Sequence, residues 1–188
     1  LAKLTALTEL YLSETQVSDL SPLAGLTKLK VLSAWGTQVS DLLPLAKLTA
    51  LTELYLSKTQ VSDLSPLAKL RALEKLYVQS TQVSDLSPLA GLTKLKVLYT
   101  WGTKIEDLSP LAGLTALTEI ATGDNERVSD LSPLAGLTAL TELYVQNTQV
   151  SDLSPLGGLT ALEKLDIQDN AQVSDLSPLA GLTKLKVL

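Results

Sequence analysis

The side chains that carry most enzyme chemistry are absent from this chain. It contains no histidine and no cysteine. A Ser-His-Asp triad, a cysteine nucleophile, and a thiolate or imidazole metal site are therefore all excluded. Any catalysis would depend on carboxylates, lysines and hydroxyls, so the spacing of the carboxylates decides whether the chain can be an enzyme.

Two pairs of carboxylates can be compared with the pair in a glycosidase. Glu119 and Glu142 occupy equivalent positions in neighbouring sequence repeats, and Asp124 lies two residues before Glu126. A glycosidase holds its two carboxyl groups roughly 5 to 9.5 Å apart and raises the pKa of one of them. The pattern implies no cavity around either pair, and an open surface does not sustain a raised pKa. We therefore expect no enzyme activity and no cofactor.

Residues 166–170 place acidic and amide side chains close together, as a calcium loop does. Asp166, Gln168, Asp169 and Asn170 supply the oxygen atoms. The glycine and the terminal glutamate of an EF-hand are missing. We expect no metal site there.

An aspartate recurs every 22 or 23 residues along the chain. The series is Asp19, Asp41, Asp63, Asp85, Asp107, Asp130, Asp152 and Asp175. Each precedes an S-P-L or L-P-L segment, where an aspartate favours a turn by accepting backbone amides. Carboxylates stacked one repeat apart should also repel one another, which predicts a raised pKa for some of them.

The aspartate period marks a repeat that fills the chain without linkers. At 22 residues per unit, 188 residues hold about eight and a half copies. We predict a single domain, residues 1–188, whose ends lack their natural capping units. Each unit contains an apolar–exposed–apolar triplet such as Leu54, Tyr55 and Leu56, which has the period of a half-buried strand. Because each strand can pair only with its copies in neighbouring units, the predicted sheet is parallel.

The remainder of each unit is a short return path. Ser21 and Pro22 predict a helix start in which the hydroxyl caps free amides, and Gly25 ends it. This leaves room for a 3₁₀ turn but not for a long helix. Leucines at positions 20, 23, 26, 29 and 32 should point into a core shared with the adjacent units. The predicted fold is an α/β solenoid, a curved right-handed coil with the parallel sheet on its concave face and 3₁₀ or irregular turns on its convex face.

These units resemble the leucine-rich repeat family through the segment L-x-x-L-x-L-x-x-(N/T). They are more similar to its short bacterial subclass, exemplified by internalins, through D-L-S-P-L-A-G-L-T. The resemblance implies a bacterial adhesin that binds a protein and is secreted or at the cell surface rather than cytoplasmic. Where the family usually has an asparagine that bonds the neighbouring backbone, most units here have threonine. Only Asn125 and Asn170 remain, both in 23-residue units, which predicts a wider turn whose backbone groups threonine cannot reach.

All aromatic residues fall at two positions on the outward side of the predicted strands. The tyrosines are Tyr11, Tyr55, Tyr77, Tyr99 and Tyr144, and the tryptophans, two residues further along their units, are Trp35 and Trp101. Because neighbouring strands lie about 4.8 Å apart, Tyr55, Tyr77 and Tyr99 should form a row with Trp101 at its end. Such a row can serve as a recognition patch or simply stabilise the sheet by cross-strand packing.

The tryptophans allow a second interpretation. The inward position before each is small, Ala34 and Thr100, so the indoles could bend inward and fill that space.

The unit after Trp101 has small residues where other units have large ones. It reads Ala121, Thr122, Gly123, Asp124, which predicts a shallow depression with an acidic rim, flanked by Tyr99, Trp101 and Tyr144. The candidate partner-binding residues are therefore Trp35, Tyr55, Tyr77, Tyr99, Trp101, Ala121, Gly123, Asp124 and Tyr144.

The charge distribution narrows the class of partner. The net charge is −5 and the basic residues are scattered singly, whereas nucleic acids and anionic membranes require a coherent positive face. No apolar run approaches the roughly 20 residues that a membrane span needs. We expect a non-catalytic scaffold that binds a protein partner, with no nucleic acid and no membrane insertion. The alternatives are a carbohydrate-binding or adhesin module, an interaction domain of a larger intracellular regulatory protein, and an end-to-end homodimer through uncapped repeats.

Overall fold

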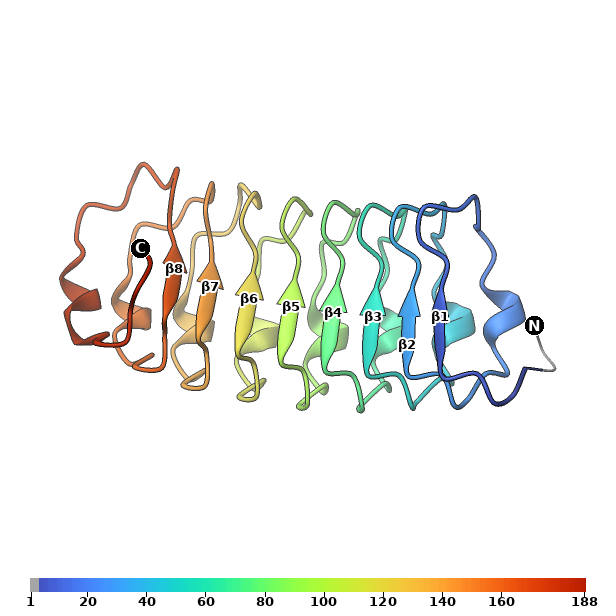
Figure 1. Ribbon diagram of the computed structural model, residues 1–188. Helices are drawn as coiled ribbons and strands as arrows, with labels where there is room; N and C mark the ends of the chain where they lie inside the picture. The colour runs from blue at the N-terminus through green and yellow to red at the C-terminus, as the bar shows by residue number, and fades with distance from the viewer. Residues whose placement is uncertain (1–3) are drawn as a thin grey trace.

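The computed structural model describes residues 4–188, in which short strands form one parallel sheet (Figure 1). The strands are β1 (Glu9–Tyr11), β2 (Val31–Ser33), β3 (Glu53–Tyr55), β4 (Lys75–Tyr77), β5 (Val97–Tyr99), β6 (Glu119–Ala121), β7 (Glu142–Tyr144) and β8 (Lys164–Asp166). Their order in the sheet is their order in the chain. Equivalent residues of successive units pair directly, as Tyr55 pairs with Tyr77 and Tyr77 with Tyr99. The predicted parallel sheet and its register are confirmed.

A 3₁₀ turn follows every strand of the sheet and lies on the opposite side of the coil (Figure 1). These turns are η1 (Ser21–Leu23), η2 (Leu43–Leu45), η3 (Ser65–Leu67), η4 (Ser87–Leu89), η5 (Ser109–Leu111), η6 (Ser132–Leu134), η7 (Ser154–Leu156) and η8 (Ser177–Gly181). Each has its proline at the start, where the missing amide is not needed. The predicted leucine-rich-repeat solenoid is confirmed.

The aspartates, not the serines, cap these turns. In η3 the backbone amide of Ser65 donates to Asp63 Oδ1 at 2.7 Å, and the Ser65 hydroxyl donates to Asp63 Oδ2 at 2.7 Å. The serine hydroxyl therefore does not cap free amides, and that expectation is wrong. These bonds lower the pKa of the carboxyl group at Asp19, Asp63, Asp107, Asp152 and Asp175. The raised pKa expected from stacking is also wrong for these five, because hydrogen bonds favour the charged form.

The core is a single column of leucines between the sheet and the turns. In the first complete unit, Leu20, Leu23, Leu26, Leu29 and Leu32 are all buried, as predicted. The same positions in the following units join one continuous cluster, so each unit is stabilised mainly by contact with its neighbours. Neither tryptophan belongs to this cluster. The alternative in which the indoles of Trp35 and Trp101 bend inward and fill the core is therefore wrong.

The two asparagines hold the backbone more extensively than the threonines. A typical threonine, Thr59, donates only to the carbonyl of Leu56, at 2.6 Å. Asn125 accepts the amide of Ile105 at 3.1 Å and donates to the Thr100 carbonyl at 3.0 Å, both in the preceding unit. The prediction that asparagine reaches backbone groups beyond threonine is confirmed.

A residue with positive φ follows each strand of the sheet by three positions. These residues are Glu14, Gly36, Lys58, Ser80, Gly102, Asp124, Asn147 and Asp169. The amide of Gly102, for example, donates to the carbonyl of Gly123 in the next unit, at 3.1 Å. The left-handed turn thus extends the contacts between units beyond the strands.

Candidate functional site

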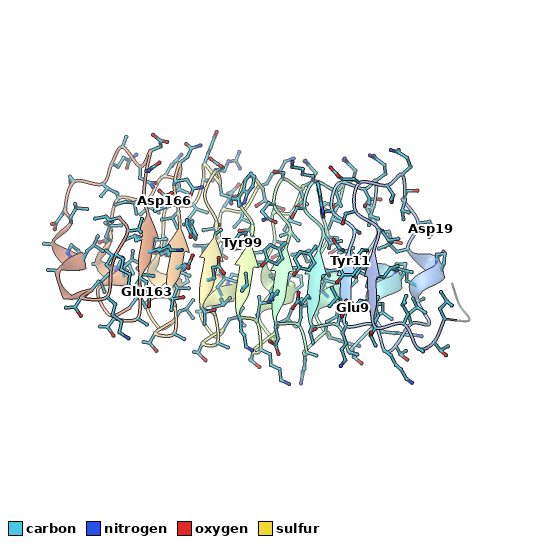
Figure 2. All side chains as sticks on the ribbon, in the orientation of Figure 1. Glu9, Tyr11, Asp19, Tyr99, Glu163 and Asp166 are labelled. Atoms are coloured by element: carbon cyan, nitrogen blue, oxygen red, sulfur yellow. The ribbon has the colours of Figure 1, made fainter. Side chains whose placement is uncertain are left out.

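The predicted tyrosine row is present on the outer surface of the sheet, which we call the sheet face. Figure 2 labels Tyr99 of this row. The ring centroids of Tyr55 and Tyr77 lie 4.7 Å apart with planes 11° from parallel. Those of Tyr77 and Tyr99 lie 5.0 Å apart at 59°. These rings are half-buried by one another, so the row both packs the sheet and presents aromatic surface.

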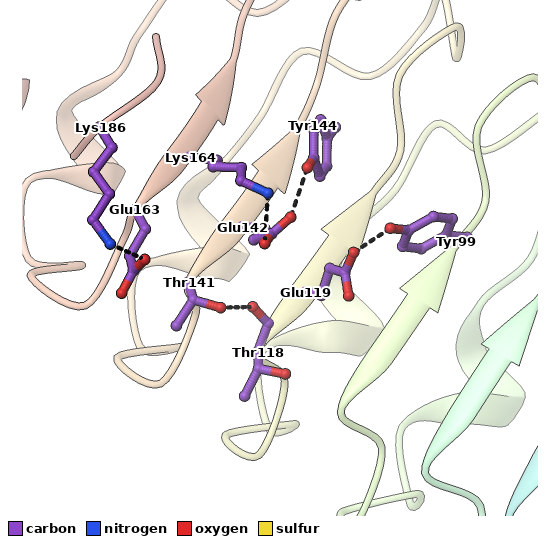
Figure 3. Close-up of polar contacts among 9 residues, drawn as sticks. All are labelled: Tyr99, Thr118, Glu119, Thr141, Glu142, Tyr144, Glu163, Lys164 and Lys186. Atoms are coloured by element: carbon purple, nitrogen blue, oxygen red, sulfur yellow. Dashed lines mark hydrogen bonds and ion pairs between the residues drawn. The ribbon is translucent and has the colours of Figure 1, made fainter. Parts of the chain in front are cut away.

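Glutamates at the first strand position bind the tyrosine hydroxyls. Tyr55 donates to Glu53 and Tyr144 donates to Glu142, each at 2.6 Å on the same strand. Tyr99 has Val97 at that position, and its hydroxyl donates across to Glu119 on β6 (Figure 3).

The protonation equilibria of these groups respond to the contacts. The hydrogen bond to Glu142, with partial burial, raises the pKa of Tyr144 to about 12. Burial and the bond to Glu119 raise the pKa of Tyr99. The pKa of Glu142 is lowered by its bonds with Tyr144 and Lys164. The tyrosines are therefore neutral donors and Glu142 is charged at physiological pH.

Lysines on neighbouring strands neutralise some of these glutamates. Lys75 Nζ lies 3.0 Å from Glu53, and Lys164 Nζ lies 3.0 Å from Glu142. Glu119 pairs in the sheet with Val97 on one side and Glu142 on the other. Within residues 4–188, Glu119 forms no ion pair. Half-buried Glu119 thus lacks the lysine partner that Glu53 and Glu142 have.

A hollow of about 190 Å³ lies on the sheet face beside these groups. It forms because Ala121 interrupts the tyrosine row between Tyr99 and Tyr144, and Trp101 forms another wall. The predicted depression is therefore present at the predicted place. Its fifth lining residue, Gln146, was not among the candidates.

Gln146 lacks a hydrogen bond that the equivalent glutamine of an earlier unit makes with the preceding unit. The equivalent Gln79 accepts a hydrogen bond from the Ser57 hydroxyl of the previous unit. Gln146 has Gly123 at that place, and a Cβ at position 123 would overlap its carboxamide. Glycine offers no hydroxyl, so the buried Gln146 Oε1 has no hydrogen-bond partner among residues 4–188.

Gly123 and Asp124, which were expected at the depression, do not line the hollow. Gly123 is buried under the Gln146 side chain. The Gln146 carboxamide occupies the space that a side chain at position 123 would need. Asp124 lies at the positive-φ position after β6 and lines a separate cavity of about 490 Å³. That cavity lies between the loops 102–106 and 124–127, beside the Arg127–Glu106 ion pair.

Trp35 lies on the same face but away from the hollow. Its ring is 5.9 Å from Lys58 Nζ, a distance at which a cation is attracted to an indole face. The structure therefore brings Tyr99, Trp101, Ala121 and Tyr144 together around the hollow, and Trp35, Tyr55 and Tyr77 do not line it.

The site offers aromatic surface together with glutamates that accept tyrosine hydroxyls. A glycosidase needs one carboxyl group with a raised pKa, whereas Glu142 has a lowered one. No set of three or more His, Cys, Asp or Glu side chains that could hold a metal occurs within residues 4–188. No helix in that same stretch is long and apolar enough to cross a bilayer.

Comparison with known proteins agrees with the geometry. A family profile described as "Leucine Rich repeats (2 copies)" matches residues 5–47, 27–69, 49–91, 71–113 and 138–181. No curated protein sequence matches the chain.

Several solved structures have the same fold. The internalin InlF of Listeria monocytogenes is 39% identical with a TM-score of 0.96, and the match covers 100% of this chain and 55% of that one. Internalin C2 of the same species is 41% identical with a TM-score of 0.92, over 96% of this chain and 80% of that one. A leucine-rich repeat protein of Leptospira interrogans, 22% identical over 99% of this chain and 50% of its own, has a TM-score of 0.91 and shows the fold alone. The chain thus spans about half the length of the InlF structure. With most of its length matched by the repeat profile and two internalins about 40% identical, the chain belongs to the leucine-rich repeat family, in its internalin-like type.

Proposed function

We propose that this chain is a non-catalytic scaffold that binds a protein partner through the sheet face around the hollow. The observation that carries the proposal is the hollow itself, whose walls are Tyr99, Trp101 and Tyr144. Tyrosine and tryptophan dominate binding hot spots because they offer a large contact area with few rotatable bonds. The two tyrosine rings are already held, Tyr99 by contact with Tyr77 and a bond to Glu119 and Tyr144 by a bond to Glu142, so they lose little side-chain entropy on association.

The relatives support the same class of function. Leucine-rich repeat domains of internalin type are interaction scaffolds, and such proteins are typically secreted or at the bacterial surface. By this analogy we place the chain outside the cytoplasm, as part of an adhesin. Carbohydrate recognition by the same aromatic walls is the competing outcome of the experiment below.

The experiment measures a purified partner, recovered by affinity capture on the immobilised protein, by isothermal titration calorimetry. The Tyr99→Ala, Trp101→Ala double variant should weaken binding by at least ~2 kcal/mol, about 30-fold, while circular dichroism shows an intact fold. Leu43→Ser is the matched control, since Leu43 is an exposed apolar side chain (68% exposed) on the opposite, 3₁₀ side of the coil. A folded double variant with unchanged affinity, or an equal loss in Leu43→Ser, would refute the proposed face. A glycan array bound by the protein and abolished by Trp101→Ala would show that the ligand is a sugar.

A further inference from the structure

Among the candidates in the fold, the hollow beside Ala121 combines the most independent features. It has aromatic walls, an unpartnered carboxamide oxygen on a lining residue, and, two residues before Ala121 on β6, a carboxylate that forms no ion pair within residues 4–188. We propose that the hollow is a specificity pocket for an arginine side chain of the partner protein. This deepens the proposed function, since it names the group that the sheet face recognises.

The walls suit a planar cation. A guanidinium group stacks on aromatic faces and is attracted by their negative quadrupole. Tyr99 and Tyr144 flank Ala121 in the sheet, and Trp101 also lines the hollow. The same surface already holds one cation over an indole, since Lys58 Nζ lies 5.9 Å from the Trp35 ring.

The charge at the edge of the hollow is complementary to arginine. Glu119 lies two residues before Ala121 on β6, on the same side of the sheet, and accepts the Tyr99 hydroxyl (Figure 3). Together with its neighbour Glu142 it places two carboxylates side by side, and Lys164 pairs with only one of them, Glu142. Half-burial of Glu119 strengthens its attraction for a cation relative to that of a fully solvated carboxylate. A second cation beside this pair is therefore favoured, whereas an anion is repelled.

Gln146 adds an acceptor that distinguishes arginine from a simple point charge. Its Oε1 atom is buried without a donor because Gly123 replaces the serine that serves Gln79. A buried acceptor without a donor costs about as much as a lost hydrogen bond. Gln146 is also one of the residues that line the hollow. The guanidinium fork has five N–H donors, so it can donate to a carboxylate and to an amide oxygen, whereas an ammonium group acts as a point charge.

The test uses small probes and does not depend on the partner. Nα-acetyl-L-arginine amide is titrated into ¹⁵N-labelled protein and followed by ¹H–¹⁵N correlation spectra. For a ligand of this size we expect a dissociation constant of about 1 mM. The largest saturable shifts should be at the Ala121 amide, the Trp101 indole and the Gln146 carboxamide. The citrulline and lysine amides are the controls for charge and for shape, and each should bind at least about fivefold more weakly.

Two matched variants assign the counter-ion. Glu119→Gln keeps an acceptor for the Tyr99 hydroxyl but removes the charge, and it should weaken the arginine probe about fivefold. Glu53→Gln makes the same change at the equivalent position of β3, where Tyr55 and Lys75 are the partners, and it should leave the probe's affinity unchanged. No saturable shift at the hollow up to roughly 50 mM probe, equal binding of citrulline or lysine amide, or equal effects of the two variants would overturn the proposal. Failure here with an intact effect of the Tyr99, Trp101 double variant on the partner would remove the arginine pocket but leave the binding face standing.

Discussion

Replacing Asn125 with alanine tests how the 23-residue units are held. The Asn125 side chain is buried and accepts both the Ile105 amide at 3.1 Å and the Thr103 hydroxyl at 2.8 Å. It donates to the carbonyls of Thr100 and Thr122, each at 3.0 Å. It therefore joins two units through groups that water does not reach.

The expected loss follows from these bonds. Alanine leaves the buried Ile105 amide without a partner, which costs about 1–3 kcal/mol, and removes further hydrogen bonds worth about 0.5–1.5 kcal/mol each. We expect a total of about 4 kcal/mol. Thr59→Ala is the matched control, because the hydroxyl of Thr59 makes one bond, to the Leu56 carbonyl. Its loss should be about 1 kcal/mol.

Urea unfolding followed by circular dichroism measures both variants. The shift of the midpoint, multiplied by the slope, gives the change in the free energy of unfolding. We expect Asn125→Ala to be destabilised at least twice as much as Thr59→Ala. Equal losses would refute it, because they would mean that the bonds to the preceding unit contribute nothing.

The remaining predictions concern the charge of Asp63, the backbone conformation of Gly102 and the missing side chain at Gly123. Hydrogen bonds to Ser65 lower the pKa of Asp63 in the folded state. The charged carboxylate therefore stabilises the fold above the unfolded pKa, near 4, and this stabilisation is lost as the pH falls below that value. The melting temperature should drop between about pH 5 and pH 3, and the drop should be smaller in Asp63→Asn. Gly102 has a φ of 64°, so Gly102→Ala should lower the free energy of unfolding in urea by about 1 kcal/mol. The control Gly113→Ala, where an added Cβ meets nothing within 4 Å, should be neutral or slightly stabilising. Equal losses in the two variants would exclude backbone strain as the cause. Gly123→Ser should supply the donor that Gln146 Oε1 lacks and raise the free energy of unfolding by about 1 kcal/mol, since only a flexible carboxamide has to move aside; a destabilised variant would contradict this view of the hollow.

Features that depend on the repeat period alone could be predicted from the sequence. The 22-residue spacing places Tyr55, Tyr77 and Tyr99 on adjacent strands in the same register, so their row needed no further information. The leucine core and the 3₁₀ turns follow in the same way. The hollow was also predictable, because Ala121 is the small residue between two tyrosine positions.

Features that depend on how two units meet could not be predicted. Gly123 was expected in the site, but the next unit's Gln146 fills the space above it. Gln146 itself was missed because its importance comes from the absence of a serine partner in the preceding unit. Glu119 was weighed only as a catalytic carboxylate, since the sequence does not show that Tyr99 reaches across to it. A signal was available in Val97, which leaves Tyr99 without a glutamate on its own strand.

The most direct test of the binding face observes Trp101 in the complex. The chain contains two tryptophans, so protein labelled with 5-fluorotryptophan should give two ¹⁹F resonances, assigned with Trp35→Phe. Saturation with the purified partner should shift the Trp101 resonance and remove its sensitivity to exchange of H₂O for D₂O, because the indole wall of the hollow becomes covered. A saturated complex in which the Trp101 resonance keeps its position and its solvent sensitivity would contradict recognition through this face.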